Sequence, residues 1–181
     1  NFVEVAESMG VIQEIDLRVV EKLLIYLRTS GQADRKLRYF VNLSRVSISD
    51  QQWIRRFHSL LRSSGVHPNQ LVFEITETAA MSEIDVTVTF IKRLKEMGCR
   101  FALDDFGAGF SSFYYLKRFD VDYLKIDGGF IRDLATDEGS RIFVRALNDV
   151  ANGLDKQVIA EWVETPEALN LLLGMGTHFG Q

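Results

Sequence analysis

The chain has 181 residues, of which 46% are hydrophobic and 25% charged, and its formal net charge is −4 at pH 7. These values predict one globular domain with a sizeable core, and the negative charge argues against a general nucleic-acid binder. The single cysteine, Cys99, excludes an intrachain disulfide and fits a reducing compartment. Because no apolar run reaches transmembrane length and the first residues lack a signal-peptide layout, we expect a soluble, cytoplasmic domain.

Helices and strands alternate along the chain after residues 2–7, a segment too short to classify. Residues 11–28 repeat apolar side chains at three- and four-residue steps, as an amphipathic helix does. The first predicted elements are helix 11–28, strand 37–43, a helix capped by Ser49 and ended by Gly65, strand 71–75, and a helix capped by Ser82 and ended by Gly98. A short strand over 101–103, a short helix after Ser111-Ser112, strand 123–127 and helix 137–154 follow. The last elements are strand 158–163 with Glu161 embedded, a helix begun by Thr165-Pro166 and ended at Gly174 or Gly176, and the start of a strand at 178–181.

The stretch 99–110 (CRFALDDFGAGF) combines a short apolar strand with two adjacent carboxylates, Asp104 and Asp105, and a glycine-containing loop. An unpaired charge loses its hydration inside a core, so two acids at a strand's exit need a compensating partner. This arrangement indicates a metal or phosphate site at the edge of a sheet. An Asp pair that only caps a turn is the alternative.

The repeated strand–helix order predicts a parallel sheet with right-handed crossovers. A doubly wound open sheet and a closed (β/α) barrel compete, and no dinucleotide glycine fingerprint follows the first strand. In a barrel the carboxyl ends of all strands surround one mouth, so polar residues distant in sequence converge there. We therefore predict the barrel, because nearly every strand ends with a polar group: Asn42, Glu74, Asp104, Asp105, Lys125 and Glu161.

The acids and the amide among these strand-end residues are oxygen donors, which suit Mg²⁺, Mn²⁺ or Ca²⁺ better than zinc. Asp104 is the candidate bridge between two ions about 3.5–4 Å apart, the spacing of two-metal phosphoryl chemistry, in which an activated water attacks phosphorus. Lys125 could orient that water or neutralise charge on the phosphate.

Each strand-end residue also has a simpler structural explanation. Asn42 could only cap a turn, and a glutamate inside an apolar strand, such as Glu74 or Glu161, could pair with a buried Lys or Arg. Lys125 and Asp127 could form a structural ion pair. The recurrence of strand-end carboxylates favours the metal site.

Four blocks of the sequence resemble the signature blocks of EAL domains, the bacterial cyclic di-GMP phosphodiesterases. The blocks are FEITET (73–78), ALDDFGAGFSS (102–112), YLKID (123–127) and AEWVET (160–165). FVEVAE (2–7), FVNLS (40–44) and the final GQ fit the same pattern, so the resemblance covers essentially all 181 residues in the right order. The resemblance implies a modified TIM-like (β/α) barrel that hydrolyses cyclic di-GMP to linear pGpG with two Mg²⁺ or Mn²⁺ ions, whereas Ca²⁺ is expected to inhibit.

The resemblance also assigns roles to individual residues. Metal ligands would be Asn42, Glu74 and Asp104 for the first ion, and Asp104, Asp105 and Glu161 for the second. The other motif positions are the water-positioning Lys125, the general base Glu161, the loop anchor Glu77, and the ligand-binding candidates Asp127, Glu164 and Gln181.

Some features depart from the family pattern. The Glu-Ala-Leu block with its metal-ligating glutamate lies upstream of residue 1, and the chain stops at Gln181, so we expect residues 1–181 to form a single EAL-type domain incomplete at both ends. Ala108 and Phe110 replace the commoner Thr and Tyr. Trp162 replaces a glycine after Glu161 and, on a strand, is expected to point away from it.

A catalytically inactive cyclic di-GMP receptor is the alternative to an active phosphodiesterase. The resemblance further implies a homodimer and upstream sensory or GGDEF domains, in a protein that could itself be membrane-anchored. No DNA or RNA polymer and no membrane contact are expected for this domain.

Overall fold

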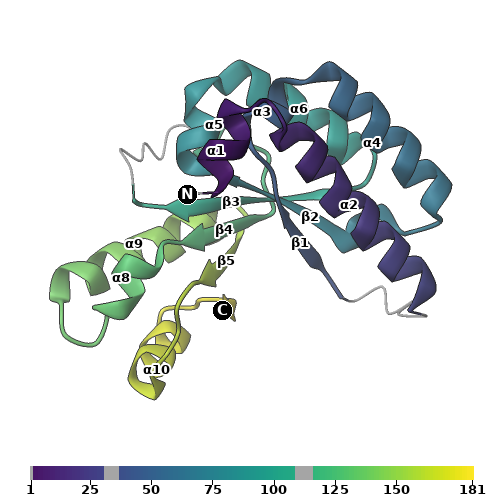
Figure 1. The fold of residues 1–181 in the computed structure, drawn as a ribbon. Helices are drawn as coiled ribbons and strands as arrows, with labels where there is room; N and C mark the ends of the chain where they lie inside the picture. Colours follow the sequence, from purple (N-terminus) through teal and green to yellow (C-terminus); the bar gives the residue numbers. More distant parts are fainter. Residues whose placement is uncertain (1, 31–36, 109–115) are drawn as a thin grey trace. The chain divides into compact units, whose positions relative to one another are not determined.

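The computed structural model describes residues 2–30, 37–108 and 116–181 (Figure 1). The chain separates into two compact units. The first unit comprises Asn1–Ile75 and Ala79–Phe101, and the second comprises Thr76–Thr78 and Ala102–Gln181. The arrangement of residues 1–181 as a single domain stays a prediction.

The first unit is a pair of parallel strands covered by helices. Strands β1 (Tyr39–Asn42) and β2 (Leu71–Thr76) pair in parallel, with Asn42 aligned to Glu74. Helix α2 packs against α4, and both can be followed in Figure 1. The helices are α1 (Phe2–Ser8), α2 (Ile12–Thr29), α3 (Arg45–Ser49), α4 (Gln51–Ser64), the 3₁₀ helix η1 (Pro68–Gln70), α5 (Glu77–Ser82) and α6 (Ile84–Glu96).

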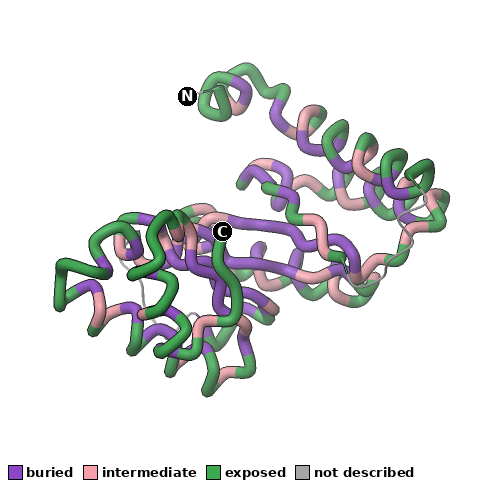
Figure 2. The backbone as a smooth tube through the Cα atoms, turned by 90° about the horizontal axis from the view of Figure 1, so that it is seen from below, coloured by how far each residue is buried: buried purple, intermediate pink, exposed green. Residues whose placement is uncertain are grey.

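Aromatic side chains fill the core of the first unit. The rings of Trp53 and Phe57 stack with centroids 5.5 Å apart, and Phe57 meets Phe73 edge-on at 5.2 Å. Phe90 and Phe101 extend the cluster. Residues 71–75 of β2 are buried on both faces, as expected for a parallel strand with helices over it. Figure 2 shows buried stretches of the backbone in purple.

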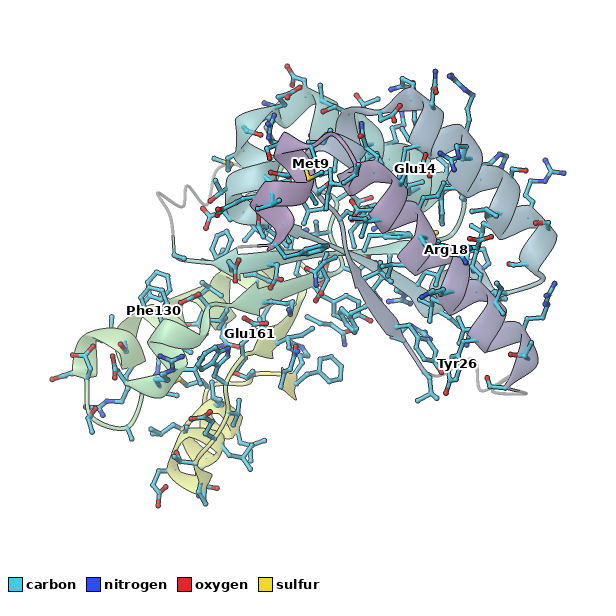
Figure 3. All side chains as sticks on the ribbon, in the orientation of Figure 1. Met9, Glu14, Arg18, Tyr26, Phe130 and Glu161 are labelled. Carbon is cyan, nitrogen blue, oxygen red and sulfur yellow. The ribbon has the colours of Figure 1, made fainter. Side chains whose placement is uncertain are left out.

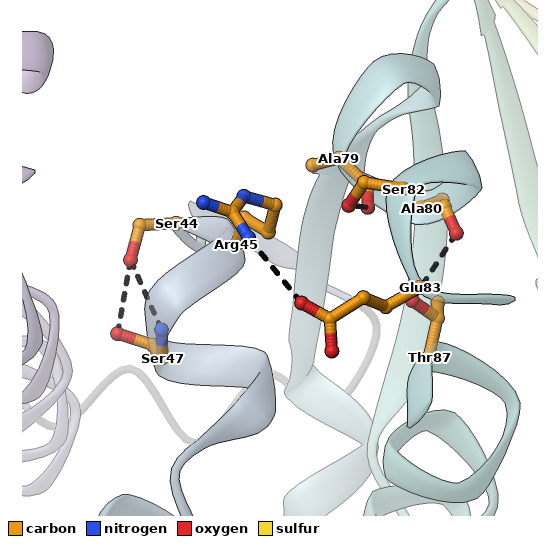
Figure 4. Close-up of polar contacts among 8 residues, drawn as sticks. All are labelled: Ser44, Arg45, Ser47, Ala79, Ala80, Ser82, Glu83 and Thr87. Atoms are coloured by element: carbon orange, nitrogen blue, oxygen red, sulfur yellow. Dashed lines mark hydrogen bonds and ion pairs between the residues drawn. The ribbon is translucent and has the colours of Figure 1, made fainter. Parts of the chain in front are cut away.

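Two of the predicted helix caps are wrong. Asp50, rather than Ser49, caps α4 by accepting a hydrogen bond from the Gln52 amide at 2.7 Å. Ser49 instead ends α3, which Ser44 caps (Figure 4). Ser82 ends α5, where its hydroxyl donates to the Ala79 carbonyl oxygen at 2.8 Å.

A buried carboxylate links α2 to the beginning of α3. Asp16 is 7% exposed, and its Oδ2 accepts hydrogen bonds from the Ser44 amide at 2.9 Å and the Ser47 hydroxyl at 2.7 Å. The Ser44 hydroxyl accepts from the Ser47 amide at 3.2 Å. These bonds fix the start of α3, which follows β1 directly.

The second unit continues the strand–helix alternation. Its strands pair in parallel in sequence order, with a register shift between Leu103 and Phe106. Asp137 and Thr165 cap α9 and α10, as the sequence predicts for Thr165. The elements are β3 (Arg100–Phe106), β4 (Tyr123–Ile126), α8 (Gly128–Arg132), α9 (Glu138–Gly153), β5 (Gln157–Ala160), α10 (Pro166–Gly174) and β6 (Phe179–Gly180).

Two sequence predictions for this unit need correction, and two further positions lie outside the described residues. Strand β3 does not stop at Asp104 but continues to Phe106, and β5 ends at Ala160, so Glu161 follows the strand instead of lying within it. The helix expected after Ser111-Ser112, and the replacement at Phe110, lie outside the described residues. Among the described residues, no helix has the length and apolarity that crossing a bilayer requires.

Candidate active site

The irregular end of β3 brings two consecutive carboxylates, Asp104 and Asp105, into one cluster. Asp104 is 8% exposed, and its Oδ1 accepts a hydrogen bond from the Asp105 amide at 3.0 Å. Asp105 has a φ of +52°, a left-handed conformation that Asp tolerates better than most residues. Neighbouring side chains on a regular strand point to opposite faces, so the irregularity lets both acids contribute to one cluster.

Lys125 lies between two of the acids. It is 3% exposed in β4, and its Nζ lies 2.9 Å from Asp104 Oδ1 and 2.7 Å from Glu161 Oε1. Glu161, labelled in Figure 3, follows β5, and its amide donates to the Ile126 carbonyl oxygen at 3.3 Å. The alternative in which Glu161 pairs with a buried lysine is therefore observed, but the pair belongs to a larger acidic cluster.

Carboxylate oxygens of Asp104, Asp105 and Glu161 all lie within 4.8 Å of one another. Burial raises the pKa of Asp105 above its ordinary value, and the nearby charges of Asp104 and Glu161 raise it further. Lys125 opposes this rise without abolishing it. A compact set of oxygen donors with excess negative charge fits a hard divalent cation.

A hydrogen bond to the Glu77 carboxylate holds the loop that follows β3. Glu77 is 5% exposed, and its Oε2 accepts from the Gly107 amide at 3.1 Å. Gly107 has a φ of +102°, and a Cβ there would lie 2.9 Å from atoms of Phe130 and Phe143, whose rings stack 4.2 Å apart. Only glycine fits this position. The contact agrees with the loop-anchoring role expected of Glu77, whose part in catalysis stays a prediction.

The three ligand-binding candidates differ in their surroundings. Asp127 accepts a hydrogen bond from the Gly129 amide at 2.8 Å and contributes to the raised pKa of Asp105. The backbone of Gln181 donates to Ala160 and accepts from the amide two residues beyond Glu161, so it brackets the segment that carries Glu161. Glu164 is exposed after this segment.

Asn42 and Glu74 lie together in the first unit. They are register partners on β1 and β2, and the Leu43 amide donates to the Glu74 carbonyl oxygen at 2.9 Å. Glu74 is buried and Asn42 is exposed. The structure thus brings these two predicted ligands together. Their joining with the carboxylate cluster in one binuclear site stays a prediction.

The strand position predicted for Trp162 is wrong, and its neighbour Arg132 was missed. Trp162 does not alternate with Glu161 on a strand, because β5 has ended and the Trp162 φ is +57°. The Arg132 guanidinium carbon lies 3.7 Å from the centroid of the Trp162 ring. The available signal was the glycine usual at this position, since a recurrent glycine indicates a positive φ.

Comparison with known proteins gives a family match over the whole chain. The sequence model of the EAL domain family matches residues 1–181. A relative from Shewanella oneidensis, the cyclic di-GMP phosphodiesterase PdeB, is 31% identical over 100% of this chain and 21% of its own length. The NbdA cyclic di-GMP phosphodiesterase of Pseudomonas aeruginosa is 34% identical over 95% of this chain and 22% of its own length. The chain thus spans about a fifth to a quarter of the length of such relatives.

Solved EAL structures show the same fold. The complex of the PaMucR phosphodiesterase with c-di-GMP superposes with a TM-score of 0.89 at 32% identity, over 98% of this chain and 72% of that one. This likeness confirms the predicted α/β fold of the TIM-like barrel type.

Proposed function

This chain belongs to the EAL domain family, and we propose that it hydrolyses cyclic di-GMP to linear pGpG with two Mg²⁺ or Mn²⁺ ions. The observation that supports this most directly is the contact of Lys125 with both Asp104 and Glu161 inside a cluster of three carboxylates. Relatives named as cyclic di-GMP phosphodiesterases and a c-di-GMP complex of a similar fold support the substrate.

Two groups of residues would hold the cations. Asp104, Asp105 and Glu161 would bind one ion, and Asp104 would share the other with Asn42 and Glu74. When bound, such ions stabilise the charge of the phosphate and lower the pKa of a water. Ca²⁺ offers the same charge with looser geometry, so we expect it to support binding and inhibit turnover.

The chain's own residues orient the reactants. The Lys125 ammonium group fixes one oxygen each of Asp104 and Glu161 and would orient the attacking water by its positive charge. Glu161 would accept the proton of that water. Glu77 holds the loop after β3 through Gly107, and so preserves the position of Asp105.

The partners also belong to this proposal. Asp127, Glu164 and Gln181 would contact the cyclic dinucleotide, and a homodimer with upstream sensory or GGDEF domains would form the working protein. The relatives are four to five times longer than this chain, which leaves room for such domains.

The test is the Glu161→Gln variant of the full-length protein, with Glu138→Gln on the exposed start of α9 as control. We expect pGpG formation with Mn²⁺, followed by chromatography, to fall about 10²–10⁴-fold in Glu161→Gln and to stay unchanged in the control. Equal turnover of the Glu161→Gln variant and the unmodified protein would refute the mechanism. Binding of cyclic di-GMP without any turnover in the unmodified protein would instead identify the inactive receptor.

A further inference from the structure

Trp162 adopts a backbone conformation that bulky residues rarely adopt. Its φ of +57° is in the left-handed region, which glycine populates without cost and a large L side chain does not. Strained residues of this kind persist where the surrounding structure holds them, and they cluster at ligand sites. Here the strained residue directly follows Glu161, a member of the carboxylate cluster.

The Trp162 indole packs closely against Gly128 at the start of α8. A Cβ on Gly128 would lie 2.6 Å from two atoms of the Trp162 ring, so only glycine permits this contact. On α8, four residues later, Arg132 places its guanidinium carbon 3.7 Å from the ring centroid, the separation of direct contact between the guanidinium and the ring. Despite both contacts, Trp162 is 50% exposed.

The contact between Gly128 and Trp162 adjoins the predicted site in the sequence. Gly128 directly follows Asp127, and Trp162 directly follows Glu161, so each partner of the contact is next to a predicted site residue. A purely structural role explains the arrangement poorly, because a glycine at 162 would adopt the same backbone without strain, and half of the indole is not buried.

We propose that Trp162 and Arg132 form a base-binding platform for one guanine of a cyclic dinucleotide. Bases stack on aromatic rings and on guanidinium planes, and proteins combine such stacking with binding of the neighbouring phosphates. An arginine held by an aromatic ring also keeps N–H groups free to donate to the O6 and N7 atoms of guanine. This inference rests on the proposed function and adds a residue pair that selects the base.

The experiment measures binding of cyclic di-GMP to the full-length protein by calorimetry in the presence of Ca²⁺. We expect Trp162→Gly to weaken binding about 5- to 100-fold, the range for loss of one base–aromatic stack. Trp162→Phe keeps a ring and should weaken it less than Trp162→Gly. Arg132→Ala should also weaken binding, whereas Arg145→Ala, an exposed arginine on α9, should not.

Two readouts separate base recognition from a structural role. Ca²⁺ affinity without nucleotide should be the same in Trp162→Gly and the unmodified protein. GMP, which carries a base, should bind more weakly to Trp162→Gly, whereas ribose 5-phosphate should bind both proteins equally. A parallel loss of Ca²⁺ or ribose 5-phosphate binding would assign Trp162 a structural role and overturn the platform.

The remaining outcomes distinguish the two proposals. If the unmodified protein binds cyclic di-GMP and Trp162→Gly binds it equally well, the platform is wrong while the proposed function stands. If the unmodified protein binds no cyclic di-GMP with Ca²⁺ or Mn²⁺, the proposed function fails and the platform fails with it.

Discussion

The two units bury carboxylates in opposite ways. In the first unit, Asp16 accepts hydrogen bonds from the Ser44 amide and the Ser47 hydroxyl, two neutral donors of adjacent local structure. In the second unit, Lys125 contacts Asp104 and Glu161, which cluster with Asp105, and the pKa of Asp105 remains raised.

This difference separates a structural acid from a functional cluster. The bonds to Asp16 stabilise the start of a helix, and no further charge is needed to explain its burial. The cluster around Lys125 carries mutual repulsion that a bound cation would relieve. Ionisable residues whose pKa values are perturbed by burial and by neighbouring charges are candidates for function for this reason.

The largest predicted effect comes from removing the ammonium group with Lys125→Met. Asp104 and Glu161 would lose their positive partner in a largely buried place, so we expect a loss of about 3 kcal/mol in the free energy of unfolding without metal. Phosphodiesterase activity should also fall at least about 100-fold. Urea unfolding and pGpG assays measure the two effects.

Metal addition sharpens this prediction. Because a divalent cation can replace the lost positive charge, Mn²⁺ should stabilise Lys125→Met more than it stabilises the unmodified protein. Lys92→Met, at an exposed position of α6, should change neither quantity. An unaltered response to Mn²⁺ in Lys125→Met would contradict the electrostatic account of the cluster.

The second prediction concerns the structural acid. Asp16→Ala leaves the Ser44 amide and the Ser47 hydroxyl without their acceptor in a buried place, which should cost about 2 kcal/mol of unfolding free energy. Mn²⁺ should stabilise this variant and the unmodified protein equally. Asp16→Asn keeps an acceptor oxygen and should cost less. A changed Mn²⁺ response would remove the contrast between the two kinds of acid.

Much of the candidate site was predictable because oxygen donors at strand ends form a regular pattern. The sequence places Asp104, Asp105 and Glu161 at or near the carboxyl ends of two strands, and the structure brings their carboxylates together. Periodicity likewise predicts α2, and Gly65, in the left-handed conformation, ends α4 as expected. Such features depend on local chemistry or on strand order, both of which are readable in sequence.

The errors arise where tertiary contacts decide between local alternatives. Ser49 and Asp50 are both favoured caps, and only the geometry of the short helix α3 selects Asp50. Residues 158–163 look uniformly strand-like, yet the backbone leaves β5 after Ala160. The contact between Trp162 and Arg132 follows that departure, so strand periodicity does not predict it.

The third prediction uses the pH dependence of the cluster. A raised pKa means that Asp105 binds its proton more tightly in the folded protein than in the unfolded chain, where the pKa of Asp is about 3.9. The contribution of Asp105 to stability should therefore be greatest at low pH. It should decline as the pH rises from the pKa of Asp in the unfolded chain through the raised pKa of folded Asp105. Asp105→Asn should flatten this part of the profile when unfolding is measured with a chelator present. A steeper decline in Asp105→Asn would contradict the raised pKa.

The smallest expected effect is on the reactivity of Cys99, which lies just before β3 in the first unit. Burial raises the pKa of this thiol to about 12, so very little reactive thiolate exists at pH 8. Alkylation should be slow in the native protein and rapid in urea, and its native rate should report local opening of the first unit. Asp16→Ala should raise this rate, because it destabilises that unit. Lys125→Met should raise it less, since its charges lie in the second unit; equal acceleration by both variants would mean that the two carboxylate environments share one cooperative stability.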